Sequence, residues 1–305
     1  MKAIKKIHAI LPRKQSQWQT SREEHDKLKL EHITGYTKGK ISMNKSLVKV
    51  KKEKTVSYLS LDSPENLNAL GLDIVSDLLN ALIETEADPG TNVVVINSSG
   101  KAFSAGGDLV NLNQQAKAQA AEEMEQLVKA VADVILYLKK MTKIVISSVK
   151  SAAAGAGFSL ALASDVIIAA DNAQFMTAFV SVGLVSDGGN LFLLSKAIGS
   201  SRALNLSLTG RPIKAEEALA LGLVAQVVPV DHLDKVTTQF AEKLAQGPLE
   251  AYRDIKALNY TVNYSELETY LKEETVAQTQ AMVSDQFIEG TDAFLTKRTP
   301  NFLRD

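Results

Sequence analysis

Apolar residues recur with two different periods from residue 47 onward. In residues 70–87 and 121–138 they return every three or four positions, which predicts two amphipathic helices. Short apolar runs predict strands over 47–50, 56–61, 93–96, 143–149, 166–170, 174–179 and 223–228. Further helices are predicted over 158–163, 191–198, 214–221, 231–246, 249–259 and 265–283. The repeated strand–strand–helix order predicts an α/β fold with a helical C-terminal region.

The pattern divides the chain into three parts. We predict that residues 1–46 form a basic and flexible N-terminal extension, 47–230 the α/β core, and 231–305 the C-terminal helical region. The stretch 1–54 holds 15 Lys and Arg against 5 Asp and Glu, and the sequence leaves open whether translation starts at Met43. Because the helices after residue 230 are expected to find little sheet left to cover, we predict that they pack on a neighbouring subunit.

The composition excludes several kinds of chemistry. The chain has 305 residues, 45% of them hydrophobic, which is enough for a substantial core. It has no Cys, which rules out disulfides, thiolate metal sites and a cysteine nucleophile. Three of the four His (His8, His25 and His32) precede residue 43, so only His232 belongs to the body of the chain. Carboxylates are therefore the main acid–base groups left.

Charge and hydropathy limit the expected partners. A net charge of −1 gives no indication of wholesale nucleic-acid binding. No apolar run reaches the ~18–20 residues of a membrane helix, and no secretory signal pattern is present. We therefore expect a cytoplasmic protein that binds neither nucleic acid nor membrane. RNA binding through residues 1–42 is the alternative to a disordered extension.

Two Gly-rich loops, 100–108 and 154–159, each follow a predicted strand and precede a helical segment. Small residues let backbone N–H groups approach a ligand closely, and a helix start adds a positive dipole end. Two such loops can direct two N–H donors at one oxygen, as in an oxyanion hole. The alternative for either loop alone is a tight turn. The second loop lacks the third glycine of a dinucleotide fingerprint, and the chain has no Walker pattern.

Asp187 is followed by two glycines and precedes the predicted helix 191–198. Most Asp residues in this position are helix N-caps, and on these residues alone that interpretation is favoured. The functional alternative is an acid–base group whose pKa is tuned by apolar surroundings. The side chains that would supply those surroundings are Phe175, Met176, Phe179, Val182 and Leu184.

Taken together, these motifs resemble the enoyl-CoA hydratase/isomerase (crotonase) superfamily from about residue 47 to 305. The matching segments are 63–70, 100–108, 154–165, 173–189, 208–210, 218–228 and 293–298. The resemblance implies a crotonase-like spiral of strand–strand–helix repeats with a C-terminal helical trimerisation region, and a homotrimer or dimer of trimers. It also implies an acyl-CoA thioester substrate, with no metal and no cofactor beyond the coenzyme A that the substrate carries.

The resemblance further implies an enolate held by two backbone N–H groups, which here would be those of Gly107 and Ala156. The two Glu positions of the hydratases are occupied by Ser159 and Phe179. Residues 175–187 are instead similar to the isomerase branch that includes the phenylacetyl-CoA epoxide isomerases. In that branch the Asp at the position of Asp187 transfers the proton. The chain departs from the branch pattern at residues 186 and 190, where Ser and Asn replace the usual Pro and Gly.

The predicted function is therefore an acyl-CoA isomerase that converts 3-enoyl to 2-enoyl thioesters. The resemblance places the substrate against Glu65, Leu67, Phe103, Ala105, Gly106, Asp108, Gly155, Phe179, Phe294 and Lys297. Phe294 and Lys297 would reach the adenine and phosphate end, in the same or a neighbouring subunit, although Lys297 reads equally as a solvated charge. Segment 109–126 is expected to cover the acyl pocket. The alternatives are a hydratase or thioester hydrolase, with Asp108 as the only other nearby base, and a catalytically silent acyl-CoA-binding trimer.

Overall fold

The computed structural model describes residues 46–303, so the predicted basic extension lies outside the described residues. A six-stranded sheet has the order β1-β2-β3-β4-β6-β9. Its strands are β1 Val48–Glu53, β2 Val56–Leu61, β3 Val93–Ser98, β4 Ile144–Val149, β6 Val166–Ala170 and β9 Gln226–Val228. Strand β1 pairs antiparallel with β2, and the other neighbours are parallel. The parallel strands are continuous apolar runs, as expected for a sheet that is covered on both faces.

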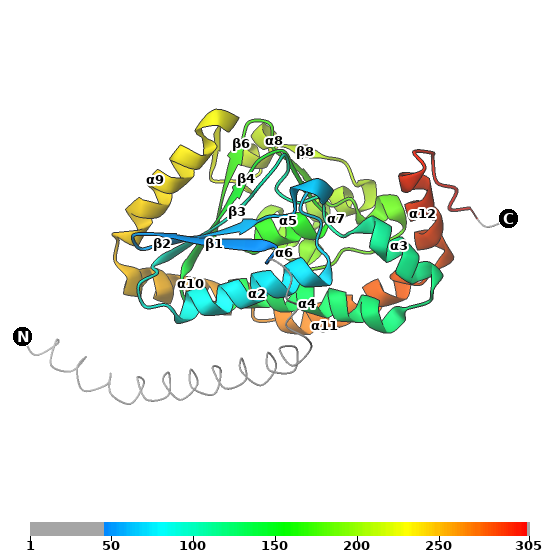
Figure 1. The fold of residues 1–305 in the computed structure, drawn as a ribbon, viewed down its shortest axis with the longest axis horizontal. Helices are drawn as coiled ribbons and strands as arrows, with labels where there is room; N and C mark the ends of the chain where they lie inside the picture. Colours follow the sequence, from blue (N-terminus) through cyan, green and yellow to red (C-terminus); the bar gives the residue numbers. More distant parts are fainter. Residues whose placement is uncertain (1–45, 304–305) are drawn as a thin grey trace, which may run out of the picture. The chain divides into compact units, whose positions relative to one another are not determined.

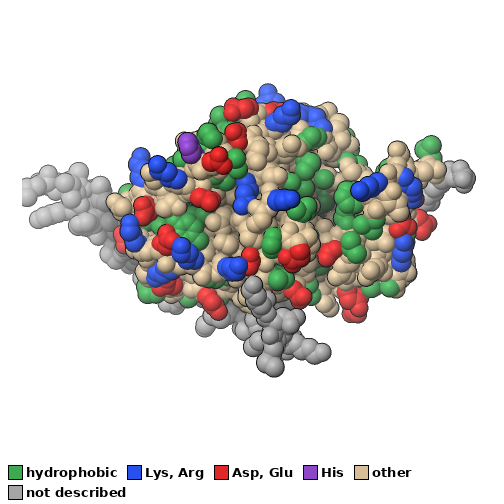
Figure 2. Space-filling model, turned by 45° about the horizontal axis from the view of Figure 1, so that its top comes forward, with side chains coloured by type: hydrophobic (Ala, Val, Ile, Leu, Met, Phe, Trp, Pro, Cys, Tyr) green, Lys and Arg blue, Asp and Glu red, His purple; other side chains and the backbone are tan. Residues whose placement is uncertain are grey.

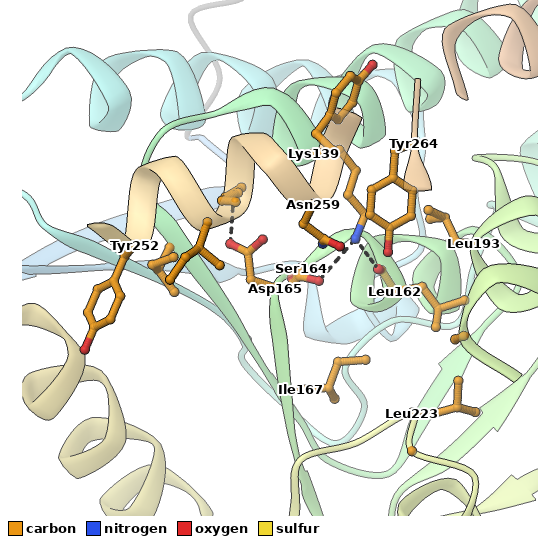
Figure 3. A pocket seen from close by; sticks show the side chains of 16 residues that line it. Lys139, Leu162, Ser164, Asp165, Ile167, Leu193, Leu223, Tyr252, Asn259 and Tyr264 are labelled. Carbon is orange, nitrogen blue, oxygen red and sulfur yellow. Dashed lines mark hydrogen bonds and ion pairs between the residues drawn. The ribbon is translucent and has the colours of Figure 1, made fainter. Parts of the chain in front are cut away.

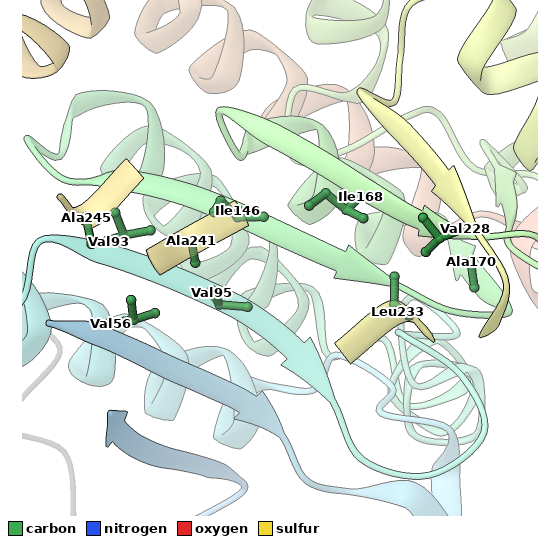
Figure 4. Close-up of a cluster of buried hydrophobic side chains, with 10 residues drawn as sticks. All are labelled: Val56, Val93, Val95, Ile146, Ile168, Ala170, Val228, Leu233, Ala241 and Ala245. Atoms are coloured by element: carbon green, nitrogen blue, oxygen red, sulfur yellow. The ribbon is translucent and has the colours of Figure 1, made fainter. Parts of the chain in front are cut away.

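Helices cover both faces of this sheet (Figure 1). Helix α9 (Leu233–Ala245) lies on one face, and α2 (Leu72–Ala87) and α4 (Ala121–Lys140) lie on the other side. Figure 4 shows the core beneath α9, where strand side chains such as Val95 and Ile146 meet Ala241 of the helix. The small residues on α9 let the helix approach the sheet closely.

A second sheet has three short strands, β5 Ala152–Ala154, β7 Gln174–Met176 and β8 Ile213–Lys214, in the order β5-β7-β8. Strand β5 was not predicted, because three alanines give no strand signal, and it leads directly into the predicted Gly-rich loop at Ala154. Helix α5 (Ala156–Ala163) follows it directly and is buried along its whole length. The strand–strand–helix order predicted from the sequence is confirmed in this central part of the chain.

The remaining elements surround these two sheets. The helices are α3 Leu109–Lys117, α6 Asn190–Ile198, α7 Ser200–Thr209, α8 Ala215–Ala220, α10 Leu249–Asn263, α11 Leu267–Met282 and α12 Asp285–Leu295. Short 3-10 turns are η1 Pro64–Asn66, η2 Phe179–Val182 and η3 Val230–His232. Helices α3, α7 and α12 were not predicted, and the predicted strand 174–179 ends at Met176. Phe179 begins η2 instead.

The prediction that the C-terminal helices lack a surface to cover is wrong for two of them. Helix α9 packs on four strands of the large sheet, and α11 packs along α4. Helix α10 is different, because Ile255, Leu258 and Val262 on one of its faces are exposed. The predicted domain boundaries and the oligomeric state stay predictions.

On the face drawn in Figure 2, acidic and basic side chains are interspersed, and no large patch carries charges of a single sign. Among the described residues, no helix combines the length and apolar character required to cross a membrane.

Candidate active site

The two Gly-rich loops meet backbone to backbone. Gly106 has a φ of +90°, and a Cβ atom on it would lie 2.7 Å from the carbonyl oxygen of Ala154. Leu70 N–H donates to Gly106 O at 2.6 Å, while Ser104 N–H donates to Ala152 O at 3.1 Å. These bonds fasten the first loop both to the start of α2 and to β5. The predicted juxtaposition of the two loops is therefore present, and it depends on the missing side chain at residue 106.

The two amides singled out by the sequence have no acceptor within residues 46–303. Neither Gly107 N–H nor Ala156 N–H donates a hydrogen bond there. Ala156 is the first residue of α5, whose first N–H groups lack partners within the helix. Gly155, next to it, donates its own N–H to Met176 O at 2.9 Å, which fixes the turn that presents Ala156. Two backbone donors at adjoining loops are therefore unpaired within the described residues.

Asp187 is not a helix cap. Helix α6 begins at Asn190 with Gly189 as its N-cap, and no side chain caps it. The interpretation of Asp187 as a helix N-cap, which the sequence alone favoured, is therefore wrong. The Asp187 residue is only 8% exposed, and its Oδ1 atom is buried without a hydrogen-bond partner among the described residues.

The Asp187 loop is fixed against the first turns of α5. Ser159 Oγ donates to Asp187 O at 2.8 Å, and Asn190 Nδ2 donates to Ser159 Oγ at 3.2 Å. Gly188, with a φ of +59°, fits where a Cβ would lie 3.0 Å from Ser159 and 3.1 Å from Val131 of α4. Ser159, one of the two positions where the hydratases have a carboxylate, thus supports the backbone of Asp187.

Helix α11 contributes two buried polar side chains to the same place. Gln278 Nε2 donates to Asp187 Oδ2 at 3.2 Å, and Gly189 N–H donates to Glu274 Oε2 at 2.7 Å. Burial raises the pKa of Asp187 to about 6, and the hydrogen bond from Gln278 opposes this effect. Burial, with a smaller contribution from the charge of Asp187, raises the pKa of Glu274 to about 8 against the bond from Gly189. At neutral pH Asp187 is therefore mostly ionised and Glu274 mostly protonated.

Gln278 and Glu274 were missed in the sequence, although a signal exists. The inward positions of α11 are Leu267, Leu271, Glu274, Thr275, Gln278 and Met282. Polar residues therefore interrupt an otherwise apolar face at helical spacing. Buried polar side chains need partners, so this interruption indicates a polar contact elsewhere in the fold.

Several predicted substrate-binding residues adjoin the two loops. Ala105 N–H donates to Leu67 O at 3.0 Å, which ties Leu67 to the first loop. The Phe179 ring lies 3.5 Å from where a Cβ of Gly155 would stand, so it covers the second loop. Glu65 lies in the exposed η1 turn, where its carboxylate accepts from Ser63 Oγ at 2.7 Å.

Other predicted residues have different positions. Phe103 is fully buried in the core. The Asp108 carboxylate caps α3, accepting from Val110 and Asn111 N–H groups at 3.2 Å. Phe294 and Lys297 are exposed at the C-terminal end of α12.

The apolar residues predicted to surround Asp187 pack at several places in the fold. Phe175 packs on Phe158, with ring centroids 5.3 Å apart. Val182 and Leu184 belong to a cluster formed by α3, α4, α11 and α12. The groups that bond to the side chain and backbone of Asp187 come from α5, α6 and α11 instead. Segment 109–126 forms α3 and the start of α4, and its Leu112 and Met124 join the same cluster.

Two of the cavities in the described residues bear on the site. A small one of about 10 Å³ adjoins Ala156 and is purely apolar. Its lining is Leu70, Val75, Leu78, Val131, Val134, Ile135, Ala156 and Leu160. A larger one of about 460 Å³ lies between α6, α10 and the amino ends of β4 and β6, and contains none of the predicted site residues (Figure 3). Within residues 46–303 no group of three or more His, Asp or Glu is placed to hold a metal ion.

Comparison with known proteins places this geometry in a family. Residues 51–305 match the model of the enoyl-CoA hydratase/isomerase family. The trans-2-decenoyl-[acyl-carrier-protein] isomerase of Streptococcus mutans is 34% identical over 81% of this chain and 94% of its own length. The 1,2-epoxyphenylacetyl-CoA isomerase of Escherichia coli is 34% identical over 82% of this chain and 95% of its own.

A solved structure agrees with these relatives. The crystal structure of an enoyl-CoA hydratase from Mycobacterium avium subsp. paratuberculosis superposes with a TM-score of 0.75 at 32% identity. The superposition covers 86% of this chain and all of that one. The crotonase fold predicted from the motifs is confirmed, and the chain belongs to the enoyl-CoA hydratase/isomerase family of enzymes.

Proposed function

We propose that this enzyme is an isomerase that shifts the double bond of a 3-enoyl thioester to the 2-position. The observation that carries the proposal is Asp187, a buried carboxylate with one oxygen held by Gln278 and the other without a partner in the described part of the chain. Its raised pKa suits a group that must both take and return a proton near neutral pH.

The reaction needs one acid–base group and one anion site. Asp187 takes a proton from C2, and the electron pair moves through the carbonyl to leave a dienolate oxygen. The N–H groups of Gly107 and Ala156 hold that oxygen. Each such donor is typically worth about 3 kcal/mol of barrier. Asp187 then gives its proton, or the deuteron that replaces it by exchange in deuterated water, to C4, and the double bond then lies between C2 and C3. Proton and electrons balance without another reactant.

The chain is less suited to adding water. A hydratase needs a group that orients and deprotonates water, and Ser159 and Phe179 occupy the two positions of its carboxylates. Ser159 is engaged with the backbone of Asp187, and Phe179 covers Gly155. Asp108, the alternative base, is engaged as the cap of α3. We therefore place hydration and thioester hydrolysis behind isomerisation.

Coenzyme A is the proposed carrier, and an acyl carrier protein is the second candidate. The Streptococcus mutans relative is named for a decenoyl group on an acyl carrier protein, whereas the Escherichia coli relative is named for a CoA thioester. In the first case the thioester arrives on a protein, in the second on a nucleotide. The proposed contacts of Phe294 and Lys297 with the nucleotide apply only to coenzyme A.

We also propose that the active form is a homotrimer or a dimer of trimers. The support on this chain is the exposed apolar face of α10, formed by Ile255, Leu258 and Val262. Light scattering of the purified enzyme checks this, with a monomer as the contrary result.

A single experiment tests the activity. The enzyme is incubated with matched 3-enoyl-CoA and 3-enoyl-acyl-carrier-protein substrates in deuterated water, and the labelled carbons are located. Formation of the 2-enoyl product, with exchange at C2 and C4, supports the proposal. Product formation on one carrier alone identifies the carrier. Addition of water as the main reaction, or binding with neither exchange nor turnover, contradicts it in favour of a hydratase or a silent binding protein.

A further inference from the structure

We propose that Gln278 is a positioning residue for this site, which holds one oxygen of Asp187 and thereby leaves the other directed to the substrate. The inference rests on the proposed function of Asp187 as the acid–base group. Gln278 lies 91 residues further along the chain, on α11, and is 1% exposed. Its role is to orient Asp187, and it is not proposed to touch the reacting atoms.

The chemistry of the two side chains fixes which group donates in this contact and which accepts. An ionised carboxylate can only accept hydrogen bonds, so the amide NH2 of Gln278 must face Asp187 Oδ2. That bond, at 3.2 Å, stabilises the charged form of Asp187, which burial alone disfavours. Because Oδ2 is engaged and Oδ1 is not, the two carboxylate oxygens are chemically distinct. A proton transferred from substrate therefore goes to Oδ1.

Glu274, one helical turn before Gln278, supports the same arrangement. Its carboxyl accepts from Gly189 N–H, two residues after Asp187, at 2.7 Å. Helix α11 thus holds the Asp187 loop at two successive turns, once through the backbone and once through the side chain. The loop cannot move without breaking both contacts, so α11 sets the direction of the carboxylate.

Few other groups around Asp187 could orient its carboxylate or stabilise its charged form. Glu274 is the titratable group that faces it from α11, and it is mostly protonated at neutral pH. Helix α5 faces the loop with the hydroxyl of Ser159, and α4 faces it with the methyl groups of Val131. Gln278 is therefore the one side-chain donor to the Asp187 carboxylate within residues 46–303.

The test replaces Gln278 with methionine, which keeps the length of the side chain and removes the donor. Gln280→Met is the matched control, because Gln280 lies on the same helix and is exposed. We expect the acid limb of the kcat profile to move up by about one pH unit, so that kcat at pH 6 falls about fivefold while KM changes less than twofold. The control should match the wild type.

A second measurement separates this inference from the proposed activity. In protein labelled with ¹³C at the Asp carboxyl carbon, the resonance lost in Asp187→Asn identifies Asp187, and its titration is followed in wild type and in Gln278→Met. A higher pKa in the variant supports the positioning role even if no isomerase activity is found. An unchanged titration, or a fall in kcat accompanied by an unchanged acid limb, overturns the proposal.

Discussion

The protein contains two buried clusters of charged side chains, and they differ in how well their polar atoms are satisfied. In the cluster around Lys139, the ammonium group donates to Leu162 O at 2.9 Å and stands 4.7 Å from the centre of the Tyr264 ring (Figure 3). Beside it, Lys256 is paired with Asp165 at 2.7 Å and also donates to a backbone carbonyl. Every charge in this cluster has a partner.

The cluster around Asp187 leaves polar atoms without partners. The buried atoms that lack one among the described residues include Asp187 Oδ1, Asn190 Oδ1, Glu274 Oε1 and Gln278 Oε1. Leaving such groups unpaired costs stability, so their presence together is typical of a site that serves a ligand rather than the fold. Both clusters perturb pKa values, since burial also lowers the pKa of Lys139 to about 8. The larger cavity is lined by Lys139, Asp165 and Lys256, which form the cluster whose charges all have partners. Neither cavity size nor a shifted pKa therefore sets the Asp187 cluster apart, whereas its four unpaired buried polar atoms distinguish it from the Lys139 cluster.

The largest expected effect is on activity, because a substitution in the Asp187 cluster should greatly lower turnover and one in the Lys139 cluster should not. Asp187→Asn removes the only proposed proton carrier, so turnover of a 3-enoyl thioester should fall by about 10²–10⁴-fold. The measurement is the rate of 2-enoyl product formation, with folding monitored by circular dichroism. Lys139→Met, in the other cluster, is the control and should keep kcat within about twofold of wild type. Undiminished turnover in Asp187→Asn would falsify the assignment.

The next effect concerns stability and belongs to the satisfied cluster. Asp165 accepts from Lys256 Nζ and, at 2.8 Å, from Val145 N–H. Asp165→Ala leaves a buried ammonium group and a strand N–H unpaired, which should cost about 3 kcal/mol of unfolding free energy. Urea titration measures this, and kcat of the folded fraction should not change. A stability within error of wild type would show that solvent reaches Lys256 and replaces its partner.

The sequence anticipated the loops and Asp187 better than their surroundings. Helices α2 and α4 were predicted because many apolar residues repeat along each, and β6 was predicted with its bounds. Helix α12 was missed, since its inward side includes Gly290, which packs directly on the backbone of Val182, and the polar Thr291. Close backbone contact leaves no apolar period to detect.

The candidate site likewise contains residues that the sequence could predict and residues that it could not. Gly107, Ala156 and Asp187 stand in local motifs, so their positions follow from short stretches of chain. Gln278 and Glu274 meet Asp187 and Gly189 across 91 and 85 residues. Such contacts depend on how α11 docks on α4, which no local pattern specifies.

A smaller effect links the reactive cluster to pH. Because the folded-state pKa of Asp187 is raised from 3.8 to about 6, its contribution to stability is fully present below pH 3.8 and lost as pH rises through 6. At pH 8 the loss is at most ~3 kcal/mol. Asp187→Asn should therefore be more stable than wild type at pH 8, by about 1–3 kcal/mol, and nearly equal to it at pH 4. Chemical unfolding at both pH values tests this. A variant less stable at pH 8 than at pH 4, relative to wild type, contradicts the origin of the shift in burial.

The smallest effect comes from an ion pair that neither cluster contains. Arg211 and Glu217 form a two-pronged pair, with N–O distances of 2.6 and 3.0 Å, but both side chains are more than a third exposed. Water and salt screen this pair, so Arg211→Ala should cost only about 0.2–1 kcal/mol, and the cost should shrink further in 1 M NaCl. Asp165→Ala is the matched comparison, since its buried partner is screened much less and its cost should survive added salt. Equal salt sensitivity in the two variants would mean that the Lys139 cluster is open to solvent. The contrast between the two clusters would then rest on the unpaired polar atoms around Asp187 alone.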